Sequence, residues 1–186
     1  MTKKRKIIIM FIVIILTIAV TVCYVNFLRP KPTSSYIVAK EYFGSEKFKT
    51  FEKNELETNN TTIELKDLAL SVLRSSFENS GKLPENFKNI VSEELFGKLN
   101  VSRLSYFIEE NKNSKLDESC DFKIYRIYLN SNKAIVEYDY SYTLYDIMTN
   151  KILNSSITSS SLKKYKLFLE LSNENMWIIT DLLTYP

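Results

Sequence analysis

A continuous apolar run lies near the start of the chain, whereas the later parts alternate between hydrophobic and polar positions. Residues 7–25 form a stretch of 19 residues without a charge, a proline or a glycine. A bilayer core is about 30 Å thick and a helix rises about 1.5 Å per residue, so this length is enough to span it. The pattern therefore predicts a transmembrane helix over residues 7–27. The side chains expected to anchor it are those of Ile7, Phe11, Ile15 and Val22.

Basic residues flank this run mainly on its N-terminal side. They are Lys3, Lys4, Arg5 and Lys6, with only Arg29 close behind the run. Such a cluster stays in the cytoplasm, so residues 1–6 are predicted to be a cytoplasmic tail of a single-pass cell-membrane protein with an extracellular C-terminal domain. A cleaved signal peptide and a lipoprotein signal at Cys23 are the alternatives. A long apolar core disfavours the first, and the large Val22 disfavours the second.

The segment after the run predicts a stalk followed by helices. Residues 28–60 mix apolar and polar positions and contain two early prolines, which indicates a stalk or linker. Residues 61–79 place apolar side chains on one face at a helical period, with Thr61 and Glu64 as a capping box and Gly81 as a stop. Short helices are predicted after Pro84 and over residues 102–111.

The hydrophobic period then changes from 3.6 to 2, which indicates strands. Strands are predicted over residues 122–129, 134–144, 152–171 and 176–182, joined by short polar turns, and the third is expected to bend or bulge around residues 159–161. Short turns favour an antiparallel meander with one buried face. The fold class expected is therefore α+β, with about three helices packed on a curved four-stranded antiparallel sheet in a domain of residues 61–186.

Composition limits the chemistry of this domain. Four of the 25 basic residues lie in the N-terminal tail, so without them the net charge falls from +3 to −1. A near-neutral domain without a basic block is not expected to bind nucleic acid. The chain has no histidine, which removes the commonest general base and zinc ligand. No metal site, cofactor or catalytic residue is predicted, and Cys120 is expected to be a free thiol.

Two groups of side chains in the predicted strands are candidates for function. Glu137 and Asp139 share a face, but their alternation with apolar neighbours predicts that they are solvated. Tyr138, Tyr140, Tyr142 and Trp177 are candidates to line a ligand cavity, although aromatic side chains in strands more often simply pack. Asp181 is a further candidate acid, or the end of a strand.

The element order and the last hairpin resemble the nuclear transport factor 2-like superfamily. Residues 173–182, NENMWIITDL, are similar to its frequent final hairpin, and residues 132–138, NKAIVEY, to its usual second strand. The resemblance implies a curved sheet that cradles a helix over residues 61–186. The superfamily's enzymes use an Asp or His in a conical pocket, and this chain departs from them because it has no histidine.

The resemblance and the predicted anchor together imply a non-catalytic function. In a Gram-positive bacterium, to which the Lys, Asn and Ile content points, such chains include scaffold subunits of conjugation or type IV secretion machines. We therefore expect an envelope protein that binds other envelope proteins or itself. The alternatives are a surface domain that binds a small hydrophobic ligand, as a sensor or minor enzyme, and a protein of sporulation or another envelope process.

Overall fold

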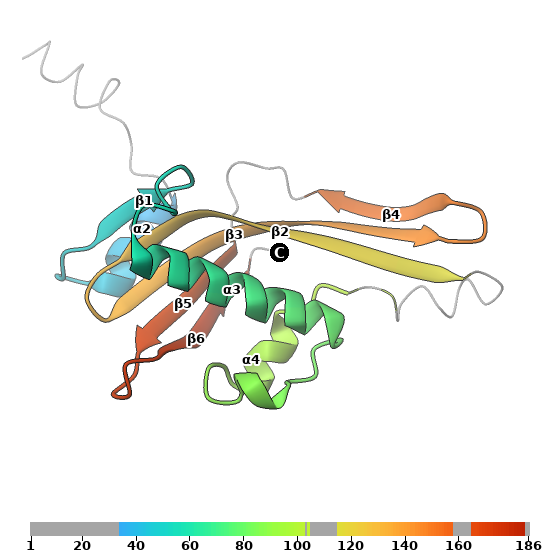
Figure 1. The fold of residues 1–186 in the computed structure, drawn as a ribbon. Coiled ribbons are helices and arrows are strands. Elements are labelled where there is room, and N and C mark those ends of the chain that lie inside the picture. Colours follow the sequence, from blue (N-terminus) through green and yellow to red (C-terminus); the bar gives the residue numbers. More distant parts are fainter. Residues whose placement is uncertain (1–33, 103, 105–114, 158–164, 185–186) are drawn as a thin grey trace, which may run out of the picture. The chain divides into compact units, whose positions relative to one another are not determined.

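A computed structural model describes residues 34–102, 104, 115–157 and 165–184. Contacts divide the chain into residues 1–37 and residues 38–186, and the fold below is that of the second unit. The elements, shown in Figure 1, are α2 (Ser34–Phe43), β1 (Lys49–Glu52), α3 (Asn60–Glu78), the 3₁₀ turn η2 (Glu85–Phe87), α4 (Glu93–Lys98), β2 (Leu116–Leu129), β3 (Lys133–Asp146), β4 (Lys151–Ile157), β5 (Tyr165–Leu171) and β6 (Trp177–Leu183).

The transmembrane helix predicted over residues 7–27 lies outside the described residues, as do the four cations that precede it. Among the helices that the structure describes, none is both long enough and apolar enough to cross a membrane. The longest of them, α3, has 19 residues and carries polar side chains along one side. The described residues therefore give no support to the predicted single-pass anchor.

The sheet is larger than the four-stranded one that the sequence predicts, and that fold class is wrong. The described sheet has six antiparallel strands. Five of them follow the order β1-β2-β3-β5-β6, and the sixth, β4, pairs with β3. One added strand, β1, comes from the segment predicted as a stalk and pairs with the end of β2. The other arises because the single strand predicted over residues 152–171 is two strands, β4 and β5. In the described part of the chain this sheet dominates, and three short to medium helices lie against it.

Strand β3 divides its second edge between two partners. Its first half, residues 133–138, pairs with β5, and its last part, residues 141–146, pairs with β4. Both partners run antiparallel to β3 along this edge, and residues 158–164, where a bend or bulge of a single strand over residues 152–171 was expected, lie outside the described residues. Figure 1 shows β4 at the end of β3 that is remote from β5 and β6.

Helix α3 confirms the predicted helix but not its predicted cap. The helix starts at Asn60, and the side chain of Asn59 accepts a hydrogen bond from the backbone N–H of Thr61 at 2.9 Å. Asn59 thus satisfies an orphan donor of the first turn, the role that the sequence assigned to Thr61 and Glu64. After Glu78 the chain turns through Gly81, whose φ of +76° favours glycine. The helix predicted over residues 102–111 lies almost entirely outside the described residues.

Both faces of the sheet are buried in the half built by β1, β2, β3 and β5, whereas the sequence predicts one buried face. Helices α3 and α4 cover one face and share with it the larger core, which includes Leu65, Leu73, Phe96 and Val136. The C-terminal half of α2 covers the other face, where Ala39, Phe43, Tyr128, Ile135 and Phe168 form a second cluster. The hydroxyl of Tyr42 donates to the carbonyl of Leu169 at 3.1 Å, which ties α2 to β5.

Candidate functional site

The aromatic side chains proposed as cavity lining are packed: Tyr138, Tyr140 and Trp177 belong to or contact the larger core, and Tyr142 packs against Phe77. Tyr138, Tyr142 and Trp177 are 2%, 0% and 5% exposed, and Tyr140 is half-buried. Tyr138 and Tyr140 both contact Tyr165, with ring centroids 5.5 and 5.3 Å apart. Burial raises the pKa of the Tyr138 hydroxyl well above its usual value. These side chains therefore contribute packing area between sheet and helix.

Glu137 is buried, against the prediction that it faces solvent. Its side chain is one of four charged groups that stand opposite one another on neighbouring strands, in the order Glu52, Arg126, Glu137 and Lys166. Arg126 binds Glu52 through Nε and Nη2 at 2.7 and 3.0 Å, and its Nη1 lies 3.3 Å from Glu137 Oε2. The Nζ atom of Lys166 lies 3.4 Å from Glu137 Oε1. We call these four residues the charge ladder.

The charge ladder alternates in sign, and its two innermost members are almost inaccessible. Glu137 and Lys166 are each 1% exposed. Hydrogen bonding to Glu52 raises the pKa of the Arg126 guanidinium, which stays charged. The period-2 pattern placed Glu137 on the second face correctly, but this face is covered by the second core, which the pattern did not reveal. Ionic pairing between strands explains how these charges are tolerated there.

Asp139 is also buried, and it lies where the sheet divides. It is 5% exposed and follows the last residue of β3 that pairs with β5. Its carboxylate accepts a hydrogen bond from the backbone N–H of Tyr140 at 2.8 Å. Since neither β5 nor β4 is registered against residues 139 and 140, a side chain that satisfies a backbone donor there stabilises the division.

The β3–β4 turn displays apolar side chains to solvent, although the sequence pattern predicts a polar turn there. Ile147, Met148 and Ile152 are 45%, 74% and 62% exposed. Asp146 fixes the turn, because its carboxylate accepts hydrogen bonds from the Met148 N–H and the Thr149 hydroxyl, both at 2.9 Å. We call Ile147, Met148 and Ile152 the hairpin tip. Two large apolar residues inside a turn were the signal in the sequence, since turns favour Gly, Asn, Asp, Ser and Pro.

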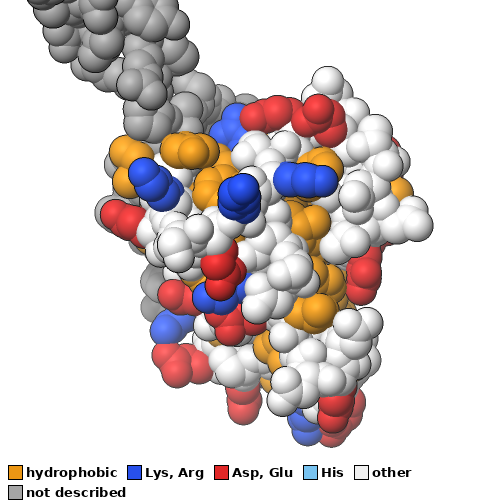
Figure 2. All heavy atoms as spheres, turned by 90° about the vertical axis from the view of Figure 1, so that its left-hand side faces the viewer, with side chains coloured by type: hydrophobic (Ala, Val, Ile, Leu, Met, Phe, Trp, Pro, Cys, Tyr) orange, Lys and Arg blue, Asp and Glu red, His pale blue; other side chains and the backbone are white. Residues whose placement is uncertain are grey.

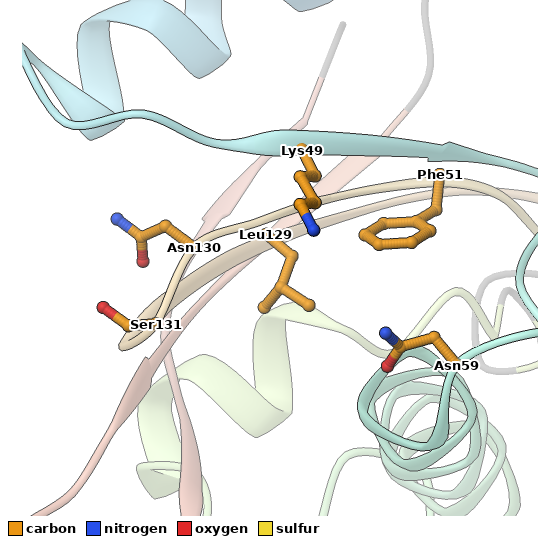
Figure 3. Close-up of a pocket in the computed structure, with 6 residues that line it drawn as sticks. All are labelled: Lys49, Phe51, Asn59, Leu129, Asn130 and Ser131. Atoms are coloured by element: carbon orange, nitrogen blue, oxygen red, sulfur yellow. The ribbon is translucent and has the colours of Figure 1, made fainter.

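A pocket of about 270 Å³ lies at the opposite end of β2 and β3. Figure 3 shows its lining residues, which come from β1, from the β2–β3 turn and from the start of α3: Lys49, Phe51, Asn59, Leu129, Asn130 and Ser131. None of the aromatic residues proposed from the sequence lines it. Residues 49, 51 and 59 fell within the predicted stalk, where a strand of four residues is too short to show a period.

Acidic and thiol groups offer no metal centre or nucleophile in the part of the chain that the structure describes. No group of three or more potential ligands is placed to hold a metal ion there. Cys120 is a free, half-buried thiol in β2, as expected, and burial raises its pKa to about 12. Its thiolate is therefore scarce at neutral pH. Asp181 is exposed on β6 and accepts a hydrogen bond from the following backbone N–H.

No protein-family model matches the chain, and no curated protein matches it in sequence.

Proposed function

We propose that this domain is a protein-interaction module that binds an extended segment of another protein along β4, with the hairpin tip as the apolar anchor. The observation that carries the proposal is the exposure of Ile147, Met148 and Ile152 on a turn held in place by Asp146. Large exposed apolar side chains that are fixed before binding lower the entropy cost of association. Residues of this kind are typical anchors of protein interfaces.

The backbone of β4 adds a second binding element. Among the described strands, β4 pairs only with β3, so no described strand occupies its other edge. Proteins usually protect such edges by shortness, charge or a covering segment. The other two edges follow this rule: β1 has only four residues, two of them charged, and β6 is met by Val91 at Ile179. In contrast, β4 has seven residues and only one charge.

An extended segment of the partner fits this surface better than a flat partner surface does. It would add a strand to β4 through main-chain hydrogen bonds, and its apolar side chains would contact Ile152 and the neighbouring tip. A non-catalytic role agrees with the packing of the candidate aromatic residues and with the raised pKa of Cys120. Within this proposal, a scaffold role in a conjugation or secretion assembly stays a prediction, as does the resemblance to the nuclear transport factor 2-like superfamily.

Site-specific photo-crosslinking in the producing cells tests the proposal. A benzophenone amino acid replaces Met148 in one variant and Met176 in a control, because Met176 is also exposed, at 38%, but lies on the β5–β6 turn. We expect one discrete heterologous product from position 148, its loss when Ile152→Asp is added, and no such product from position 176. Identical products from both positions would refute the role of the tip. A product with twice the mass of the chain would replace the proposed partner by a second copy.

A further inference from the structure

We propose that the pocket between β1, the β2–β3 turn and the start of α3 binds a small organic anion that has a carboxylate and an apolar body. The site is independent of the proposed interaction surface, because it lies at the other end of β3 from the hairpin tip. Its volume of about 270 Å³ is near the lower end of small-molecule sites. The expected ligand is therefore compact.

The apolar wall of the pocket is held in place by the core. Phe51 and Leu129 line it, and both also pack against the larger hydrophobic cluster. In the register of the sheet, Lys49 is opposite Leu129 and Phe51 is opposite Ile127. Because alternate residues of a strand point to the same face, Lys49 and Phe51 both face the side of the sheet on which α3 lies. A ligand body there would contact an aromatic ring and a leucine side chain.

The charge of the pocket selects an anion. Lys49 is the only charged lining residue, and no acidic residue lines the pocket. Within the described part of the chain Lys49 has no ion-pair partner, whereas lysines such as Lys66 and Lys98 are paired with glutamates. Figure 3 shows the Lys49 ammonium directed into the space beside Phe51 and Leu129. A carboxylate there would gain a charge-assisted hydrogen bond next to an apolar surface.

Asn59 supplies a second donor from the opposite wall. Its side-chain oxygen already accepts from the Thr61 N–H at 2.9 Å, so its amide NH₂ group is the part that can donate to a ligand. Figure 3 shows this side chain reaching into the pocket from the start of α3. The N-terminal end of a helix of 19 residues adds a partial positive charge on the same side.

The alternative to anion binding is a purely structural role for Lys49. A lysine that points inward from an edge strand hinders pairing with another sheet, and β1 is an edge strand. This structural role requires only that Lys49 places a charge near the edge of β1. It predicts no saturable binding in the pocket, so the two interpretations have different experimental outcomes.

Titration of the ¹⁵N-labelled full chain with phenylacetate, followed by two-dimensional NMR, tests the proposal. We expect saturable shifts at the backbone N–H groups of Lys49, Phe51, Asn130 and Ser131, and none with the cation phenethylammonium. The variant Lys49→Gln should weaken phenylacetate binding about tenfold, as expected for one charge-assisted hydrogen bond. The control Lys53→Gln, an exposed lysine that does not line the pocket, should bind like the unaltered chain.

Three results would overturn the inference. They are no saturable shift at these N–H groups, equal binding of the neutral phenylacetamide, and equal weakening by Lys49→Gln and Lys53→Gln. Photo-crosslinking at the hairpin tip can fail or succeed without changing any of these results, because it involves different residues.

Discussion

Breaking the charge ladder at Glu137 should destabilise the domain far more than replacing the buried pair as a whole. The perturbation is a double-mutant cycle of Glu137→Leu and Lys166→Met, which exchange the charged groups for apolar ones of similar size. In Glu137→Leu, the Lys166 ammonium stays 1% exposed and loses the carboxylate 3.4 Å away. Arg126 keeps its two hydrogen bonds to Glu52, so the cost falls mainly on Lys166.

The structure sets the expected sizes. Removing one partner of a buried pair costs about 3–5 kcal/mol, which we expect for Glu137→Leu. Lys166→Met should cost less, about 1–2 kcal/mol, because Glu137 retains Arg126 at 3.3 Å. The double variant should lie within about 1 kcal/mol of the unaltered domain, since an apolar pair needs no desolvation of charge. The interaction energy of the cycle is then at least about 3 kcal/mol.

Urea unfolding followed by circular dichroism measures these differences, provided that the slope with denaturant stays the same in all four proteins. A control cycle uses Lys88 and Glu85, an ion pair whose side chains are 55% and 84% exposed. Its interaction energy should stay below about 1 kcal/mol. If the effects at Glu137 and Lys166 were additive within about 0.5 kcal/mol, the ionic interpretation of their burial would be wrong.

Three further predictions concern a cap and two buried groups. Asn59→Ala should lower the free energy of unfolding by about 1 kcal/mol, whereas Thr61→Ala should change it by less than about 0.5 kcal/mol. Equal effects of the two substitutions would support the capping box of Thr61 and Glu64 instead. Cys120 in a Cys23→Ser background should react with iodoacetamide at pH 8 at least about 100-fold more slowly folded than in urea, as measured by mass spectrometry; equal rates would contradict its raised pKa. The pKa of Tyr128 is raised to about 12, first by burial and then by Glu137, so its neutral form is favoured in the folded state. Stability should therefore be constant below about pH 10 and decrease as the pH rises toward 12, with a smaller decrease in Tyr128→Phe; the same slope in both proteins would exclude this contribution.

The sequence predicted the parts of the fold whose periodicity is local. The helix over residues 61–79 and the strand over residues 134–144 correspond to α3 and β3, because each is long enough to repeat its pattern several times. The count of strands was wrong for a non-local reason. Residues 152–171 were expected to form one strand with a bend or bulge around residues 159–161, whereas β4 and β5 pair with separate parts of β3. Strand β1 has four residues, too few to reveal an alternation.

The candidate sites were less accessible to sequence reasoning. Polar residues that alternate with apolar ones indicate a solvated face, yet Glu137 and Asp139 are buried, and α2 with its cluster covers that face of the sheet next to Ile135. Whether a second layer covers a face depends on distant segments. The pocket has the same origin, since Lys49, Asn59 and Ser131 come from three separate elements. Only the hairpin tip carried a local signal, in the apolar residues of its turn.

The division of β3 separates two parts of the sheet that differ in local stability. Residues 133–138 are clamped between β2 and β5, where Leu167 and Leu169 are fully buried. The section bearing β4 has one edge that no described strand occupies, and residues 151–155 are exposed or half-buried. Amide protons of β4 should therefore exchange with deuterium through a small local opening that leaves the protons of β5 protected. Binding of a partner at the hairpin tip should therefore slow amide exchange most strongly in that section of the sheet.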